Sequence, residues 1–290
     1  MSSPGSTVVV WGNCQADPIA SLLREPLSRH GLTVATVPPV FLATEDELRQ
    51  VYELVADSAH LISQPIGERY RIPGCGTEAM AAQLPPTGRL ITYPSAFHVG
   101  AFPYQVNAHG GDGERVGAPL TDYHDLRAIV AAERGMSVPQ AMSWWPAPSQ
   151  DAVREVAAES FERLRRRENG LDVTVSQLLD DPKAMMTIDH LSNTVLAELA
   201  GSLLRTLGID EPVDVPSREF LGARRTPLEP AVLQAHGWPA EAASTRWRID
   251  GRDVPPAELL AAHLDLYRDR PDVVVDSRTR YADRLRSLEL

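Results

Sequence analysis

Short apolar runs alternate with amphipathic segments over residues 7–92, and this alternation limits the possible folds more than any other feature. Residues 7–11 form a β-branched run that ends at Gly12, which is typical of a strand buried on both faces of a parallel sheet. Further strands are expected at 32–37, 60–62 and 89–92, with helices at 18–30 and 44–55 between them. Because this order requires right-handed crossovers, the sequence predicts an α/β fold, a parallel sheet flanked by helices in three Rossmann-like layers.

The remainder of the chain is expected to be mostly helical. Residues 93–120 are rich in glycine and proline and are interpreted as a binding loop or lid. Helices are expected at 122–134, 149–167, 173–179 and 193–207, then near 228–236 and 255–268, with a strand at 245–249. We expect a catalytic core over residues 1–210 and a C-terminal helical extension over 211–290 that packs on it.

Charge and composition exclude several classes of function. The net charge is −11, from 39 acidic and 28 basic residues, which gives no support to nucleic-acid or anionic-membrane binding. The polar start of the chain lacks the features of a signal peptide, and no apolar run is long enough for a membrane helix, so a cytoplasmic location is expected. Lys183 is the only lysine, which disfavours Schiff-base chemistry. No metal-binding motif is present, and two cysteines make neither a disulfide framework nor a zinc site.

The segment Gly12-Asn13-Cys14-Gln15 is the strongest candidate for chemistry. It falls between the first strand and the first helix, where ligands bind in open parallel sheets. Cys14 would lie close to a helix N-terminus, whose amides favour a thiolate, and Gln15 offers an amide to a developing oxyanion. The alternative, that Cys14 is a small buried residue, carries equal weight on position alone. Cys75, within a Pro-Gly-Cys-Gly turn, is expected to be structural.

Two further positions fit a pocket around Cys14. His190 lies between an apolar run and a helix beginning near Ser192, where it could serve as a base oriented by Asp189, although a capping role is favoured on position alone. Gln64 follows the third strand and should share the sheet edge of Cys14, but a plain strand end is equally compatible.

An arginine cluster near the end of the helix at 149–167 includes Arg163 and Arg166. Guanidinium groups suit phosphates, but a solvated helix end that complements the dipole is the more common explanation.

Taken together, these motifs resemble one protein family. The strand with Gly12-Asn13-Cys14-Gln15 is similar to the start of the WcbI-type polysaccharide-biosynthesis acetyltransferases. Further similarity follows in order at residues 62–66, at 93–94 with Phe97, at 123–125, at 160–168 with Asp172, and at 189–193. The resemblance covers about residues 7–210.

The resemblance implies transfer of an acetyl group from acetyl-coenzyme A to a sugar or glycan hydroxyl, on a core like that of SGNH hydrolases. Cys14 would stand in the place of the nucleophilic serine, His190 in that of the late histidine, and Gln15 beside the thiol. The positions implied to bind substrate or coenzyme A are Gly12, Asn13, Gln64, Tyr123 and Asn193, with Arg163 and Arg166 as candidates for its phosphates. No metal is implied.

One departure from the family pattern keeps other functions open. His190 is followed by Leu191, where the family has a proline that would hold the start of the helix rigidly. This change, with the irregular loop, is compatible with a secondary-metabolite tailoring enzyme that hydrolyses an ester or expels an activated leaving group. A non-catalytic protein that docks a second chain through its C-terminal segment is a third hypothesis, and a homo- or hetero-oligomer fits any of them.

Overall fold

The computed structural model describes residues 6–290, and the expected polar tail at the start of the chain falls largely outside them. The chain forms two compact units that alternate along the sequence. The first unit runs to Ala96 and adds Leu164–Asp180 and His190–Leu221; the second comprises Phe97–Arg163, Asp181–Asp189 and Gly222–Leu290. The domain division expected at residue 210 stays a prediction.

The first unit contains the predicted parallel sheet. Its strands are β1 (Thr7–Trp11), β2 (Thr33–Ala35), β3 (Ser58–Ser63) and β4 (Arg89–Thr92), in the order β2-β1-β3-β4. Each neighbouring pair is parallel, and Trp11, Ser63 and Thr92 come into register where the three longer strands end. The predicted α/β fold is confirmed.

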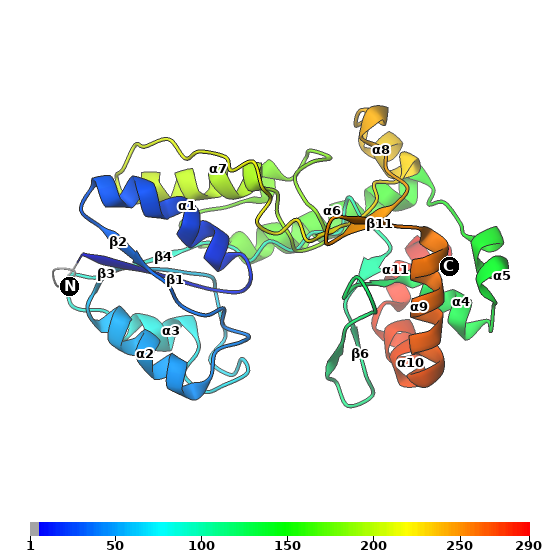
Figure 1. Ribbon diagram of the computed structural model, residues 1–290, viewed down its shortest axis with the longest axis horizontal. Coiled ribbons are helices and arrows are strands. Elements are labelled where there is room, and N and C mark those ends of the chain that lie inside the picture. Colours follow the sequence, from blue (N-terminus) through cyan, green and yellow to red (C-terminus); the bar gives the residue numbers. More distant parts are fainter. Residues whose placement is uncertain (1–5) are drawn as a thin grey trace. The chain divides into compact units, whose positions relative to one another are not determined.

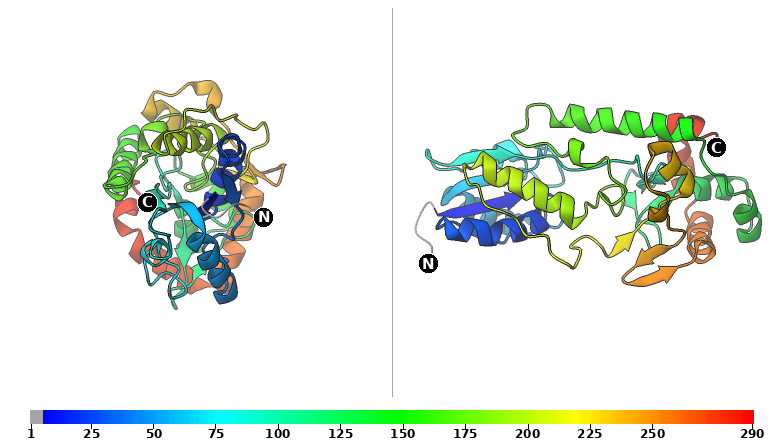
Figure 2. Two further views of the ribbon diagram at one scale, coloured as in Figure 1. Left: turned by 90° about the vertical axis from the view of Figure 1, so that its left-hand side faces the viewer. Right: turned by 90° about the horizontal axis from the view of Figure 1, so that it is seen from above.

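Helices cover both faces of this sheet. Helix α1 (Ala16–Arg29) lies beside α7 (Asn193–Thr206) on one face, as Figures 1 and 2 both show. Helices α2 (Glu45–Ala56) and α3 (Thr77–Ala81) cover the other face (Figure 1). The three-layer arrangement expected from the sequence is therefore present in the first unit.

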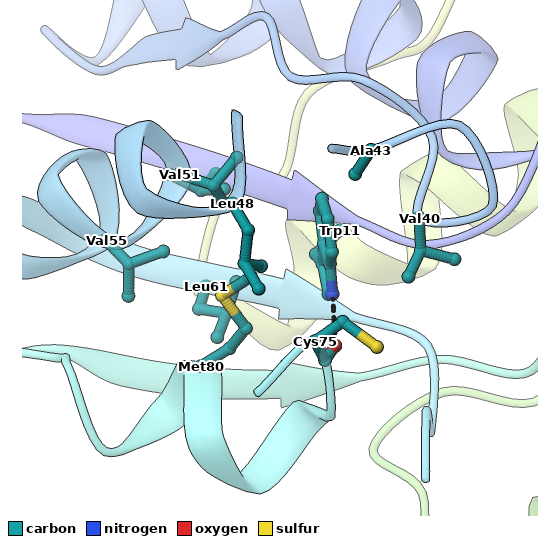
Figure 3. Packing of buried hydrophobic residues seen from close by; sticks show 10 residues of the cluster. Trp11, Val40, Ala43, Leu48, Val51, Val55, Leu61, Cys75 and Met80 are labelled. Atoms are coloured by element: carbon teal, nitrogen blue, oxygen red, sulfur yellow. Dashed lines mark hydrogen bonds between the residues drawn. The ribbon is translucent and has the colours of Figure 1, made fainter. Parts of the chain in front are cut away.

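The layer between the sheet and α2 is a continuous apolar core (Figure 3). It joins one leucine and two valines of α2 to Trp11 and Leu61 of the strands, and to Met80 of α3. The Trp11 indole N–H donates to the carbonyl oxygen of Cys75 at 2.9 Å, which satisfies a polar atom inside an apolar layer. This core fixes the end of β1, and so it fixes where the following turn begins.

The start of α2 is held by a capping box between Thr44 and Glu47. The Thr44 hydroxyl oxygen accepts from the Glu47 backbone N–H at 3.3 Å, and the Glu47 carboxylate accepts from the Thr44 N–H at 2.8 Å. The hydrogen bond from the Thr44 backbone is the main reason that the pKa of Glu47 is lowered.

The helix expected at 173–179 is wrong: the segment contains only a single 3-10 turn, Ser176–Leu178. Glu168, the buried last residue of α6 (Gln150–Glu168), accepts the backbone N–H groups of Val175 at 2.6 Å and Ser176 at 2.9 Å. These donors are therefore committed to a side chain instead of to helical carbonyls.

The second unit is built from short strands and helices. It pairs β5 (Gln105–Val106) with β8 (His124–Asp125) and β6 (Ala108–His109) with β7 (Arg115–Val116), and it joins β9 (Arg224–Arg225), β10 (Trp247–Ile249) and β11 (Arg252–Val254) in one antiparallel sheet. Its helices are α4 (Leu126–Glu133), α5 (Val138–Trp144), most of α6, α8 (Pro230–His236), α9 (Pro256–Asp269), α10 (Pro271–Arg280) and α11 (Ala282–Ser287).

Most elements expected in this part of the chain are confirmed, but one helix begins later than predicted and the structure adds elements that were not predicted. The helix predicted from residue 122 begins only at Leu126, because His124 and Asp125 pair with β5. Helices α5, α10 and α11 and strands β9 and β11 were not predicted; α10 starts at Pro271, directly after α9. No helix within residues 6–290 is long and apolar enough to cross a membrane.

Candidate active site

Three loops of the first unit meet at the carboxyl edge of the sheet. They follow β1, β3 and β4, and because these strands are parallel neighbours, Gly12, Gln64 and Tyr93 emerge at the same edge. The Gln64 N–H donates to the Trp11 carbonyl at 3.0 Å, and the Tyr93 N–H donates to the Ser63 carbonyl at 3.1 Å. The sheet ladder thus continues one residue into the loops after β3 and β4 and places them beside the end of β1.

Gln64 braces the turn that carries Cys14. Its Oε1 accepts the backbone N–H of Asn13 at 2.8 Å, and its Nε2 donates to Gln15 Oε1 at 3.2 Å. Gln64 is 2% exposed, so this amide is committed to the protein at both ends. Gln64 lies on the sheet edge where it was expected and braces the turn, and its predicted role in binding a ligand stays a prediction.

Asn13 and Gln15 hold the same turn from its other side. The Asn13 Oδ1 accepts the Gln15 N–H at 2.9 Å, while its Nδ2 donates to the Ser95 hydroxyl at 2.8 Å. Gln15 is fully buried; its Nε2 donates to the Ala96 carbonyl at 2.9 Å, and its Oε1 accepts the Ala96 N–H at 3.1 Å. Both side chains therefore fix the turn to the loop after β4, and the oxyanion role of Gln15 stays a prediction.

Cys14 lies in the middle of this rigid turn. Its side chain is half-buried, and the next residue, Gln15, is the N-cap of α1. The Gln15 side chain makes no capping hydrogen bond to the helix. A helix N-terminus favours negative charge, so the turn presents the sulfur where a thiolate or a bound anion is stabilised.

Cys75 differs from Cys14 in its burial and in its surroundings. It is fully buried in the core beneath the sheet, and its thiol donates to the Tyr70 carbonyl at 2.8 Å. It is the structural cysteine that its turn context predicted.

Gly12 and Tyr93 complete the cradle around the turn. A Cβ atom on Gly12 would lie 2.6 Å from Gln64 Oε1 and 3.0 Å from the Tyr93 hydroxyl, so the position excludes a side chain. Burial, and then the negative charge of the Cys14 thiolate, raise the pKa of Tyr93 well above its usual range, which keeps the phenol protonated. Among the residues described, the structure provides no hydrogen-bond partner for this buried hydroxyl.

Tyr93 is a candidate site residue that the sequence analysis missed. An unpaired buried hydroxyl costs about 1–3 kcal/mol, so this group calls for an explanation, and its place against Gly12 makes it a candidate for the site. The sequence could have indicated Tyr93 as a site residue, because it directly follows the fourth strand just as Gln64 directly follows the third.

His190 precedes α7, whose N-cap is Ser192. The far end of α7 is located by Arg89, at the start of β4, whose guanidinium donates to the Thr206 carbonyl at 3.0 Å. Helix α7 therefore runs back from the carboxyl edge of the sheet to its amino edge, and its first residues lie toward the edge that carries Cys14. The half-buried His190 is thus placed on the same side of the sheet as α1 and toward the same edge.

Tyr123 and Asn193, two of the residues predicted to bind a ligand, form hydrogen bonds with other parts of the protein. In the second unit, the Tyr123 hydroxyl donates to Asp189 Oδ1 at 2.5 Å, and Thr187 bonds both of these groups. In the first unit, the Asn193 amide donates to the carbonyls of Pro216 and Arg218 at 2.9 and 2.8 Å. Their roles toward a ligand stay predictions.

The arginines lie on the exposed surface of α6. Arg163 forms an ion pair with Glu159 one turn earlier, at 3.0 Å, and both side chains are more than half exposed. Arg166 lies one turn further along the same helix. In the described part of the chain, no group of three or more His, Cys, Asp or Glu side chains is arranged to hold a metal ion.

Comparisons with known proteins agree with this architecture. A solved structure of WcbI, described as a novel polysaccharide biosynthesis enzyme and as the native protein without a disulfide bond between coenzyme A and one of its cysteines, matches with a TM-score of 0.83. The match covers 98% of this chain and 97% of that chain at 17% sequence identity, so it establishes a common fold. No curated protein matches in sequence. The family model for the polysaccharide biosynthesis enzyme WcbI matches residues 7–212, and the chain therefore belongs to the WcbI family of polysaccharide biosynthesis enzymes.

Proposed function

We propose that this protein transfers an acyl group, in the first instance acetyl, from acetyl-coenzyme A to a hydroxyl of a sugar or glycan precursor. The observation that carries the proposal is the turn at Cys14, where a half-exposed thiol lies at the N-terminus of α1 in a cradle of buried hydrogen bonds. The likeness of the whole chain to a WcbI protein described with coenzyme A supports the choice of donor.

In this mechanism the acceptor hydroxyl attacks the thioester carbonyl. The new acyl–oxygen bond forms as the carbon–sulfur bond of the donor breaks, and His190 takes the proton from the hydroxyl and passes it to the departing coenzyme A thiolate. Attack by Cys14 first would form an acyl-thioester on the enzyme as the carbon–sulfur bond of the donor breaks, and His190 would pass the Cys14 proton to the departing coenzyme A thiolate. The acceptor hydroxyl would then displace the Cys14 sulfur from the acyl group, and His190 would return the hydroxyl proton to that sulfur. In either route the thiol and histidine take the places of the serine and late histidine of an SGNH-like core.

The turn residues have two tasks in this scheme. Backbone amides at the start of α1 and the Tyr93 hydroxyl would donate to the developing oxyanion, and one well-aimed donor is worth about 3 kcal/mol in the transition state. Asn13, Gln15 and Gln64 keep those donors in place, since their own amides are bonded to one another and to the loop at Ser95 and Ala96.

The phosphates of coenzyme A would be held by arginines on α6. The exposed pair between Arg163 and Glu159 is worth only about 0–1 kcal/mol, so Arg163 can exchange its partner for a phosphate at little cost. Arg166 on the same helix supplies a second guanidinium. A cytoplasmic location and an oligomeric state stay predictions.

The first test is calorimetric titration of coenzyme A and acetyl-coenzyme A into the wild type and into Arg166→Ala. We expect micromolar binding that weakens about tenfold in the variant, equivalent to one lost charge-assisted contact. Arg49→Ala, which removes an exposed arginine from α2, is the matched control and should bind as the wild type does.

The role of the thiol is tested in the same preparation. Intact-mass spectrometry after incubation with acetyl-coenzyme A should show one acetyl group, which Cys14→Ser abolishes and Cys75→Ser leaves in place. Absence of binding at millimolar ligand would overturn the proposal and favour a tailoring hydrolase on the same fold. Full activity in Cys14→Ser would exclude the route through an acyl-enzyme.

A further inference from the structure

The second unit contains a cavity of ≈ 220 Å³ that plays no part in the site described above. Its walls are mostly apolar and include Met142, Trp145, Trp247, Leu259 and Leu260. Exposed residues at 244 and 245 also line it, so it is open to solvent. We name it the Arg127 cavity, after the charged residue in its wall.

The Arg127 guanidinium is fully committed to the protein. Its Nε and Nη2 donate to the two carboxylate oxygens of Asp125 at 3.1 and 2.7 Å, and Nη2 and Nη1 donate to those of Glu229 at 2.7 and 3.1 Å. Nη1 also donates to the Pro146 carbonyl at 3.3 Å. The rings of Tyr104 and Trp145 cover its faces at 3.8 and 4.5 Å from Cζ. No N–H is left for an anionic ligand.

The charges in the wall disfavour an anion as well. Two carboxylates face one guanidinium, which leaves a net charge of about −1 by simple addition. His263, which also lines the cavity, adds no positive charge at neutral pH, because burial is the main cause that lowers its pKa to about 4. A phosphate, sulfate or uronic acid would therefore be repelled.

The carboxylates around Arg127 can still accept hydrogen bonds from a neutral polar ligand, and two side chains nearby have donors without a partner. Asp125 Oδ2 and both oxygens of Glu229 each accept a single hydrogen bond from the described residues, although a carboxylate oxygen accommodates two. A second cavity of ≈ 50 Å³ shares Asp125, Arg127 and Glu229, and Tyr104 and Gln105 line it. The Tyr104 hydroxyl and the Gln105 Nε2 are buried and, within residues 6–290, have no hydrogen-bond partner.

We propose that the Arg127 cavity binds a neutral sugar ring. Carboxylate oxygens that can accept further hydrogen bonds line the Arg127 cavity, and the unpaired hydroxyl and amide donors line the second cavity, which shares Asp125, Arg127 and Glu229 with it. A hydroxyl is the neutral group that can satisfy both kinds of partner. The flat apolar face of a pyranose packs against an indole, which Trp247 provides beside Leu259. A cation could use the acceptors and the rings, but it would leave the donors of Tyr104 and Gln105 unpaired.

The inference does not depend on the thiol chemistry. Every residue that lines the two cavities belongs to the second unit, whereas Cys14 and His190 belong to the first. The test is therefore performed without coenzyme A, so that its failure leaves the donor-binding proposal as it stands.

Saturation-transfer NMR with methyl glycosides of glucose, galactose and mannose provides the test. At least one of these neutral probes should receive saturation from the wild-type protein, with a Kd of about 1 mM, as expected for a single small ring. The anionic methyl glucuronide should bind at least about tenfold more weakly than its neutral counterpart, because of the charge in the wall.

Two matched tryptophan variants locate the binding. Trp247→Leu should weaken binding about tenfold or more, whereas Trp144→Leu should not change it, since Trp144 stacks on Arg134 outside the cavity walls. Thr245→Trp, at an exposed position that lines the cavity, should block binding without disturbing the core even if Trp247→Leu fails to fold.

Three results would overturn the proposal. One is the absence of saturation transfer to all three neutral glycosides. Another is transfer that persists unchanged when Thr245→Trp fills the cavity, which would place the sugar elsewhere. The last is tighter binding of tetramethylammonium than of any neutral glycoside, which would make the cavity a cation site.

Discussion

Single atoms decide the geometry of the turn after β1. The Oε1 of Gln64 lies 2.6 Å from where a Cβ atom on Gly12 would be, and this same oxygen holds the Asn13 N–H. A methyl group at Gly12 must therefore displace the amide that braces the thiol. Moving the Gln64 amide would also break the hydrogen bond from its nitrogen to Gln15, which is buried.

We predict that Gly12→Ala lowers the free energy of unfolding by about 1–3 kcal/mol, the usual cost of overpacking, and weakens coenzyme A binding at least about tenfold. Gly67→Ala is the matched control, because its Cβ would meet no atom within 4 Å. Denaturant titration and calorimetry of the two variants provide the measurement. Equal stability and affinity of the two variants would show that the turn tolerates a side chain.

At the scale of elements, the start of α7 is tied to a distant segment. Asn193 is 1% exposed, and its side chain bonds the backbone of Pro216, Arg218 and Phe220 at 2.8–3.0 Å. Its own backbone N–H donates to Glu219 at 2.7 Å. The helix that follows His190 is thus anchored by an amide at its first residue, which holds this end of the helix without the proline of the family pattern.

Asn193→Ala should leave two carbonyls and one N–H without their partner and cost about 1–3 kcal/mol of stability. Hydrogen exchange should accelerate at the Phe220 amide, while amides in β1 and β3 keep their protection. Asn107→Ala is the control, since the Asn107 side-chain oxygen accepts only an exposed contact from Arg115. Unchanged exchange at Phe220 would contradict the anchoring role.

At the scale of the whole molecule, stability depends on two buried histidines of the second unit. The pKa of both His124 and His263 is lowered to about 4, primarily by burial. His124 bonds the Val116 carbonyl through Nε2 and the Tyr267 hydroxyl through Nδ1, each at 2.8 Å, so its neutral form donates once and accepts once. A second proton on its ring would displace the Tyr267 donor.

The unfolded chain, with histidine pKa values near 6.5, binds more protons than the native protein between pH 6.5 and pH 4. The stabilisation is therefore complete above pH 6.5 and is lost as the pH falls toward 4, by about 3 kcal/mol for one histidine. His124→Gln keeps a donor and an acceptor but does not titrate. Urea unfolding across this range should show a shallower loss of stability for this variant than for the wild type, and an identical loss would refute the linkage.

Local sequence patterns determined the fold of the first unit and the location of its candidate site. Hydrophobic periodicity marked the strands and helices, and the Thr44 and Glu47 pair marked the start of α2, because burial and capping act over a few residues. The same patterns placed Cys14 between a buried strand and a helix start, and Gln64 on the same sheet edge. They also separated Cys14 from the structural Cys75.

Only the tertiary structure decided what those side chains do. Gln64 meets Asn13 and Gln15 across about fifty residues of sequence, and the unpaired Tyr93 hydroxyl joins them from a third strand end. The 3-10 turn in place of the helix expected at 173–179 follows from Glu168, and the sugar cavity proposed here follows from contacts of Arg127 with Glu229. Such contacts join residues that no periodicity relates, because hydrogen bonding between distant segments depends on how the whole chain packs.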